Sequence, residues 1–219
     1  MLTGTESSQS SYSEPDTIYY RPELNPVCTA RQAAVCACEK GTWISSVNHW
    51  QKQDRLIVVL NKPGIYGKVN TLEKGEKKFF SKPVFLKRQN DYPEIFCAIS
   101  ENGQCYISRY CFDNAKWYCC EKISTSCKSI YYMDVIEDSH ERAVLVYAGI
   151  LSAHKGLQIY SRYLDGDRWS REVIEEYPGA SVNRPKLALN GNDPIIVADA
   201  YFNGKFHVIW KRLSEAGKA

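Results

Sequence analysis

Four basic residues occupy equivalent places in a repeated pattern and are the first candidates for binding chemistry. Each precedes a proline or serine that opens a run of strand-forming residues, at Arg21-Pro22, Lys82-Pro83, Lys128-Ser129 and Arg184-Pro185. Proline is tolerated at the first residue of a strand because no ladder donor is needed there. If these runs are the inner strands of a radial fold, the four cations form a mouth that binds a carboxylate or phosphate group. The alternative is that each cation is a solvated residue at a strand start.

A second candidate set combines arginine with tyrosine on two later strands. Arg109-Tyr110 and Arg162-Tyr163 follow Gly103 and Gly156 at the same spacing, so we place them at matching positions of the repeat. Repeated sets of this kind can form one sugar or peptide pocket per repeat. Arginine can equally lie over an aromatic ring as packing, and we favour packing.

Tryptophans close two of the repeat units. The segments FDNAKWYCCEKI (112–123) and LDGDRWSREVI (164–174) align so that Trp117 matches Trp169. Aromatic side chains with a polar tip are common anchors of binding surfaces. The aromatic residues expected to anchor a ligand or partner are Trp43, Trp50, Tyr66, Trp117, Tyr163 and Trp169.

The sequence gives little support for a metal site or for an acid–base catalytic site. Nine cysteines are present, but only Cys36-x-Cys38 would present two sulfurs on one strand face, and no paired C-x₂-C pattern occurs. The four histidines are scattered, and no phosphate-binding glycine loop is found. Asp91 and Asp193 could do acid–base work from the ends of strands, although turn-forming aspartate is the commoner explanation. We therefore expect no metal and no cofactor.

The elements that would position these residues are short strands in a repeat. A turn ending in glycine precedes an aromatic strand at Gly41, Gly103, Gly156 and Gly204. The preceding runs AAVCAC, EIFCAIS, AVLVYAG and IIVADAY are apolar rather than alternating, which indicates burial on both faces. Four units of about four antiparallel strands predict an all-β fold, a small β-propeller of four blades. A β-sandwich and a solenoid are the alternatives.

The predicted domain is bounded as follows. Residues 1–15 are rich in serine and threonine and are expected to be a disordered tail, and 16–219 form the propeller. The blades are predicted at about 21–60, 81–123, 127–175 and 183–213, with an insertion at 61–80. Because the last unit lacks an outer strand, we expect Thr17–Tyr20 to supply it and close the ring.

Residues 164–174 also resemble a family. Asp165, Gly166 and Trp169 are similar to the Asp-box turn of sialidase-like propellers, although Arg168 stands where that turn has threonine. The resemblance covers roughly residues 82–212 at the level of single blades, and it implies the propeller fold. Family sialidases use an arginine triad, a tyrosine–glutamate pair and an aspartate acid, and that set has no placement in this sequence.

Composition and charge exclude some classes of function. The charge balance of 28 basic against 25 acidic residues gives a net charge of +3, too small to indicate nucleic acid, and no apolar run is long enough to span a membrane. No export signal is evident, so a cytoplasmic location with reduced thiols is expected. We interpret the chain as a non-enzymatic binding module that engages a protein partner through one face and the 61–80 loop. A glycan-binding lectin and a sialidase-like glycoside hydrolase are the alternatives, and a homo-oligomer is expected if four blades cannot close.

Overall fold

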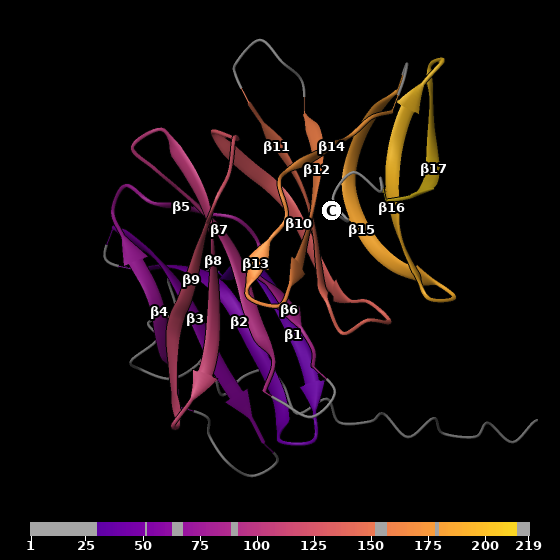
Figure 1. The fold of residues 1–219 in the computed structure, drawn as a ribbon. Helices are drawn as coiled ribbons and strands as arrows, with labels where there is room; N and C mark the ends of the chain where they lie inside the picture. The colour runs from indigo at the N-terminus through magenta and orange to yellow at the C-terminus, as the bar shows by residue number, and fades with distance from the viewer. Residues whose placement is uncertain are drawn as a thin grey trace, which may run out of the picture.

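The protein is all-β in a computed structural model that describes residues 30–50, 52–62, 68–88, 92–151, 157–177 and 180–213. Its strands form four separate antiparallel sheets, arranged side by side along the chain (Figure 1). The prediction of a small all-β propeller is thereby confirmed. No helix in the described ranges is long and apolar enough to cross a membrane.

Each sheet is one blade, numbered in chain order. Blade 1 contains β1 (Ala30–Cys38), β2 (Gly41–Trp50), β3 (Gln53–Asn61) and β4 (Asn70–Gly75). Blade 2 contains β5 (Phe79–Phe80), β6 (Val84–Leu86), β7 (Glu94–Glu101), β8 (Gln104–Asp113) and β9 (Lys116–Ser124). Blade 3 contains β10 (Ser129–Glu137), β11 (Ala143–Ile150), β12 (Gln158–Asp165), β13 (Arg168–Trp169) and β14 (Val173–Glu175). Blade 4 contains β15 (Ser181–Asn190), β16 (Asp193–Phe202) and β17 (Lys205–Arg212).

Tight turns set the register of the hairpins. Between β7 and β8, Asn102 and Gly103 have φ of 53° and 78°, and between β16 and β17, Asn203 and Gly204 have φ of 51° and 74°. Two successive positive φ angles match the right-handed twist of the flanking strands, and Asn-Gly adopts them at low cost. The glycine-ended turns of the sequence therefore form hairpins as predicted.

The blades pack face to face through three apolar seams. One core cluster joins blades 1 and 2, a second joins blades 2 and 3, and a third joins blades 3 and 4. The first strands lie next to one another in sequence order, with β6 against β1, β10 against β6 and β15 against β10. These contacts identify β1, β6, β10 and β15 as the inner strands. In the described residues no extensive contact joins blade 4 to blade 1.

Blade 1 differs from its predicted bounds. Its sheet spans 30–75 rather than 21–60, so the segment interpreted as an insertion at 61–80 contributes the fourth strand of blade 1 and the first strand of blade 2. The turn at Gly41 joins the first and second strands of its blade, whereas the turn at Gly103 joins the second and third. Aligning the repeat units on these glycines therefore shifted the predicted strands of blade 1 by one strand.

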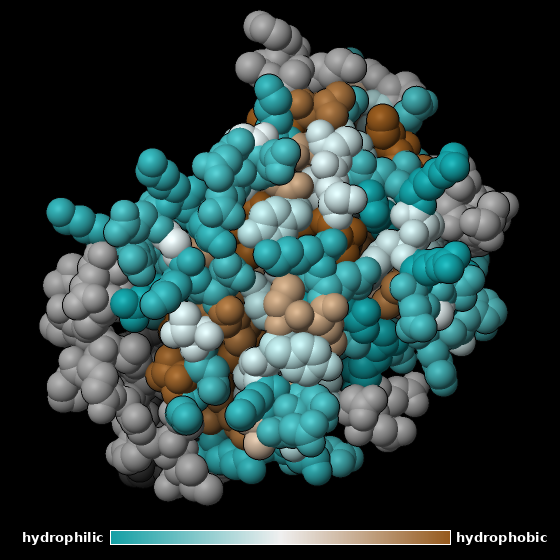
Figure 2. All heavy atoms as spheres, turned by 60° about the vertical axis from the view of Figure 1, so that its left-hand side comes forward, coloured by the Kyte–Doolittle hydropathy of each residue, from teal (hydrophilic) through white to brown (hydrophobic). Residues whose placement is uncertain are grey.

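The closing strand remains a prediction. Residues 1–15 and Thr17–Tyr20 lie outside the described residues, and β17 pairs only with β16 in the described part of the chain. The side of the molecule carrying blades 1 and 2 is mostly hydrophilic, with small separate apolar patches (Figure 2).

Candidate functional site

The four predicted cations are not seen to converge. Arg21 lies outside the described residues, as do Tyr66, Asp91 and the side chain of Trp50. Lys82 and Lys128 are exposed just before the inner strands β6 and β10. Arg184 lies inside β15 at a bulge, with φ of 48°, and its Nη1 is 3.8 Å from Oδ2 of Asp199. An anion-binding mouth stays a prediction.

Arg109 and Arg162 lie in the same seam, on facing blades, and not at matching positions. Arg109 is directly opposite Phe96, and Arg162 is directly opposite Leu145. Opposed residues of an antiparallel pair share a face, and Phe96 and Leu145 belong to one core cluster between blades 2 and 3. Both arginines therefore point into that seam.

The loop before each strand explains the difference. Gly103 directly precedes β8, whereas Leu157 separates Gly156 from the start of β12. A slip of one residue reverses every side chain in a strand. Tyr110 consequently faces blade 1 and Tyr163 faces blade 4, in the two flanking seams.

A chain of ion pairs and hydrogen bonds crosses the seam between blades 2 and 3. Arg109 donates to Glu94 at 2.7 and 2.9 Å, and its Nη1 is 3.5 Å from Oε2 of Glu121. Nε1 of Trp169 donates to the same Glu121 oxygen at 2.9 Å. The pKa of Arg109 is raised: burial opposes the charged form, but the hydrogen bonds and charges of Glu94 and Glu121 outweigh it.

A second carboxylate in this seam is equally engaged. Glu172 accepts hydrogen bonds from the hydroxyl of Tyr147 and from the backbone N–H of Ser126, and Arg162 Nη2 lies 3.6 Å away. Burial and the neighbouring Glu172 raise the pKa of Tyr147. These contacts favour the packing interpretation of the two arginines, because their partners are other side chains of the blades.

The matching tryptophans each face the preceding blade. Trp117 lies edge-on to Trp43, with ring centroids 5.2 Å apart, in the seam between blades 1 and 2. Trp169 lies edge-on to Phe96 at 6.0 Å in the next seam. Their indole rings are partly buried, so they contribute first to blade packing.

Cysteine chemistry differs from the expectation of reduced thiols. Cys111 and Cys120 form a disulfide across the hairpin of β8 and β9. Burial raises the pKa of Cys97 and of Cys127 to about 12, which keeps both thiols protonated and unreactive. No group of three or more metal-ligating side chains occurs among the described residues.

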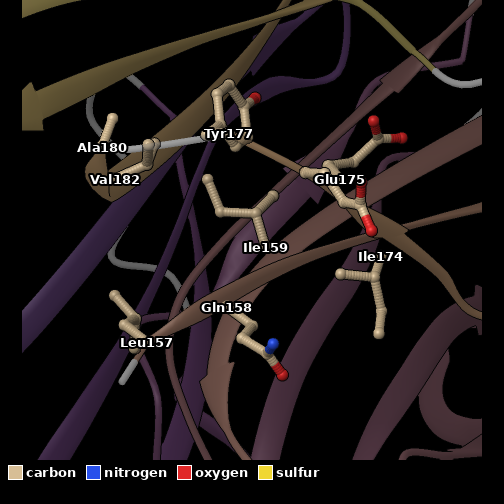
Figure 3. A pocket seen from close by; sticks show the side chains of 9 residues that line it. Leu157, Gln158, Ile159, Ile174, Glu175, Tyr177, Ala180 and Val182 are labelled. Atoms are coloured by element: carbon tan, nitrogen blue, oxygen red, sulfur yellow. The ribbon is translucent and has the colours of Figure 1, made fainter. Parts of the chain in front are cut away.

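A hollow with a volume of about 410 Å³ lies between blades 3 and 4 (Figure 3). In that view Glu175 and Tyr177 lie on one side of Ile159, and Leu157 and Gln158 lie on the other. The hollow is completed by Ile174, Glu176, Ala180 and Val182. It falls within the range of about 300–1,000 Å³ typical of small-molecule sites.

Glu175 is the buried charge of this pocket. It accepts a hydrogen bond from the hydroxyl of Ser161 at 2.6 Å, and Nζ of Lys211 lies 2.8 Å from its other oxygen. Burial and the charge of Glu175 raise the pKa of Tyr177, so its hydroxyl stays protonated as a donor. Lys211 also lies over the Tyr177 ring, 5.2 Å from the centroid.

This pocket does not follow from the sequence patterns described above. Its polar residues come from the start of β12, the end of β14 and the segment that follows β14, and no repeated motif marks them. The one available signal is the pair of acidic residues before a tyrosine at 175–177. The pocket offers carboxylate and amide acceptors, a phenol donor and apolar walls.

Three solved structures with a similar fold are two arabinanases and a sialidase. The GH43 endo-arabinanase from Bacillus licheniformis aligns over 83% of this chain at 11% identity and a TM-score of 0.50. The α-L-arabinanase of Penicillium chrysogenum, complexed with arabinobiose, aligns over 83% at 9% identity and a TM-score of 0.55. A mutant of the NanB sialidase from Streptococcus pneumoniae aligns over 82% at 9% identity and a TM-score of 0.50. The fold therefore resembles the sialidase-like propellers, as the segment around Asp165, Gly166 and Trp169 predicted.

These comparisons concern the fold alone. The chain spans 72%, 64% and 30% of the lengths of these three solved chains. No protein-family model matches the sequence. No curated protein sequence matches it either.

Proposed function

We propose that this chain recognises a carbohydrate, in the pocket between blades 3 and 4, as a propeller of the glycoside-hydrolase type. The observation that carries the proposal is a carboxylate, an amide and a phenol around one apolar-walled pocket, in a fold shared with arabinanases and a sialidase. The comparisons support a sugar ligand better than the protein partner expected from the sequence.

The chemistry of the lining suits a sugar. Carboxylate and amide oxygens accept hydrogen bonds from sugar hydroxyls, and a phenol can donate to a ring or glycosidic oxygen. The carboxylate of Glu176 and the amide of Gln158 supply acceptors, and Ile159 and Ile174 supply apolar surface for the C–H faces of the ring. A few convergent polar groups in an apolar pocket are typical of small-ligand sites.

Hydrolysis is the second candidate, because the fold neighbours include two arabinanases. Glycoside hydrolysis needs two carboxyl groups about 5–9.5 Å apart, one ionised and one able to donate a proton. Glu175 and Glu176 both line the pocket. Glu175 is paired with Lys211, whose Nζ lies 2.8 Å from its carboxylate.

A binding experiment tests the main proposal. The full chain is screened on a glycan array and titrated calorimetrically with arabinobiose and sialyllactose. Glu176→Gln is expected to weaken binding about ten-fold or more, because it removes a charged acceptor. Glu39→Gln, on an exposed turn of blade 1, is the matched control and leaves affinity unchanged. Absence of any glycan ligand would remove the proposal.

An activity assay separates binding from hydrolysis. Release of 4-nitrophenol from aryl arabinosides and aryl sialosides is measured with the wild type, Glu175→Gln and Glu176→Gln. Turnover that either variant abolishes supports an enzyme. Binding without turnover supports a lectin-type domain. A cytoplasmic location stays a separate prediction, which cell fractionation with disulfide mapping at Cys111 and Cys120 would check.

A further inference from the structure

The last blade presents an open apolar face. On β17 alternate residues are three of the four most exposed large apolar side chains of the described chain, with Phe206 84%, Val208 76% and Trp210 62% exposed. Tyr201 on β16 lies directly opposite Phe206, and Val197 lies directly opposite Trp210, so these five side chains share one face. The other face of the same sheet packs on blade 3.

Blade 1, at the other end of the row of blades, has no comparable open apolar face. In blade 1, Leu56 and Val58 face blade 2, so Ile57 and Val59 point the opposite way. Both are nevertheless buried, with 5% and 1% exposure. Among the described residues of blade 1 the one strongly exposed large apolar side chain is Val35, at 64%, so the contiguous open apolar face belongs to blade 4. Contiguous apolar surface of this kind marks an interaction site.

The shape of this face combines a ridge and a hollow. The rings of Tyr201 and Phe206 contact each other at a tilt of 54°, with centroids 5.0 Å apart, and form the ridge. The hollow has a volume of about 320 Å³ and is lined by Leu189, Asn190, Ile195, Val197, Val208 and Trp210. Ridge and hollow are about 13 Å apart along the strand, from four residues at about 3.3 Å each.

The same face carries charges of both signs. Arg184 lies 3.8 Å from Asp199, and Arg212 lies 3.9 Å from Asp193. All four side chains are about half exposed or more, so their polar atoms remain available to a partner. A surface with paired cations and anions does not repel a copy of itself.

We propose that a second copy of this chain packs on the open face of blade 4 as a two-fold dimer. A two-fold contact is self-complementary, so a feature on one copy meets a different feature on the other. The Tyr201–Phe206 ridge of each copy enters the hollow beside Trp210 of the other. The contact continues the sheet-on-sheet packing that joins the blades within the chain.

Sedimentation velocity of the full chain over a concentration series tests the dimer. The wild type sediments as a reversible dimer at micromolar concentration. Phe206→Arg and Trp210→Arg each weaken association about 30-fold, the size typical of a central aromatic anchor. Tyr118→Arg, at an exposed tyrosine on β9 of blade 2, is the matched control and stays dimeric. Circular dichroism of each variant checks that the fold is intact.

Three results would overturn the proposal. A wild type that stays monomeric at every concentration means that another occupant, such as the chain's own N-terminal residues, covers the face. Folded Phe206→Arg and Trp210→Arg proteins that dimerise like the wild type place the interface elsewhere. Loss of the dimer in Tyr118→Arg alone would do the same.

Discussion

Strands β11 and β16 hold the same place in neighbouring blades, yet only β11 is buried on both faces. Every residue from Ala143 to Gly149 is buried, whereas burial alternates along β16. The even-numbered residues of the two strands pack together in the seam between blades 3 and 4. The odd-numbered residues of β11 face blade 2, and those of β16, including Ile195 and Val197, face outward.

The contrast shows what an apolar strand does and does not reveal. A strand that is apolar on both faces indicates a neighbour on each side. β11 has both neighbours within the chain, and in the described residues β16 has one. The sequence of β16 is therefore suited to a partner that lies outside the four described blades.

The largest difference in stability is expected when a leucine is replaced by alanine once in the enclosed blade 3 and once in the open blade 4. Leu145→Ala in β11 should lower the free energy of unfolding by about 3 kcal/mol, because the side chain is fully buried and leaves a cavity. Leu189→Ala in β15, which is 48% exposed, should cost less than about 0.5 kcal/mol. Urea unfolding in dilute protein measures both. Equal losses would show that blade 4 is as enclosed as blade 3.

A smaller difference in stability is expected when an arginine is removed from the seam between blades 2 and 3 and from the open face of blade 4. Arg109→Ala removes two charge-assisted hydrogen bonds from Glu94 in the seam, leaves the longer one from Arg88 at 3.4 Å, and should cost about 2 kcal/mol. Arg184→Ala breaks only a 3.8 Å pair on the open face and should change stability by about 0.5 kcal/mol or less. Urea midpoints with unchanged slopes give the comparison. A larger loss for Arg184→Ala would contradict the assignment of the open face.

The third comparison is between two aspartates, Asp138 and Asp199, whose contributions to stability are measured as a function of pH. Burial opposes ionisation of Asp138, but hydrogen bonds from Arg142 and the backbone of His140 outweigh it and hold its pKa below the ordinary value of 3.8. The lowered pKa stabilises the fold above the unfolded-state pKa, and this contribution disappears as the pH falls through the folded-state value. Asp138→Asn should cost about 1.5 kcal/mol at pH 7 and progressively less in acid.

Asp199→Asn is the control for this pH series, because Asp199 is half exposed on the open face. Its unfolding free energy should follow that of the wild type across the same pH range. A constant difference between Asp138→Asn and the wild type from neutral to acid pH would disprove the role of the Asp138 charge.

Repeat and turn chemistry made most of the fold predictable. Asn102-Gly103 and Asn203-Gly204 form the expected hairpin turns, and blades 2 to 4 begin near the expected residues. Blade 1 was misplaced because its glycine turn at Gly41 joins a different pair of strands. Turn chemistry identifies a hairpin but does not say which hairpin of the blade it is.

The arrangement of the site residues was harder to predict from the sequence, for a related reason. Arg109 and Arg162 share a spacing from glycine, but Leu157 shifts one strand by a residue and turns the two arginines toward each other. The pocket around Glu175 and Tyr177 depends on how two blades meet, which no local pattern encodes. The exposed side chains of β17 look like core residues in the sequence, since apolarity alone does not reveal whether a covering blade exists.

Hydrogen–deuterium exchange at two protein concentrations tests the open face most directly. Amides of β16 and β17 should gain protection as the concentration rises, because a second copy covers their outward face, while amides of β11 should exchange at the same rate throughout. Protection of β17 that does not change with concentration would contradict the dimer and leave its apolar face without the partner that the account requires.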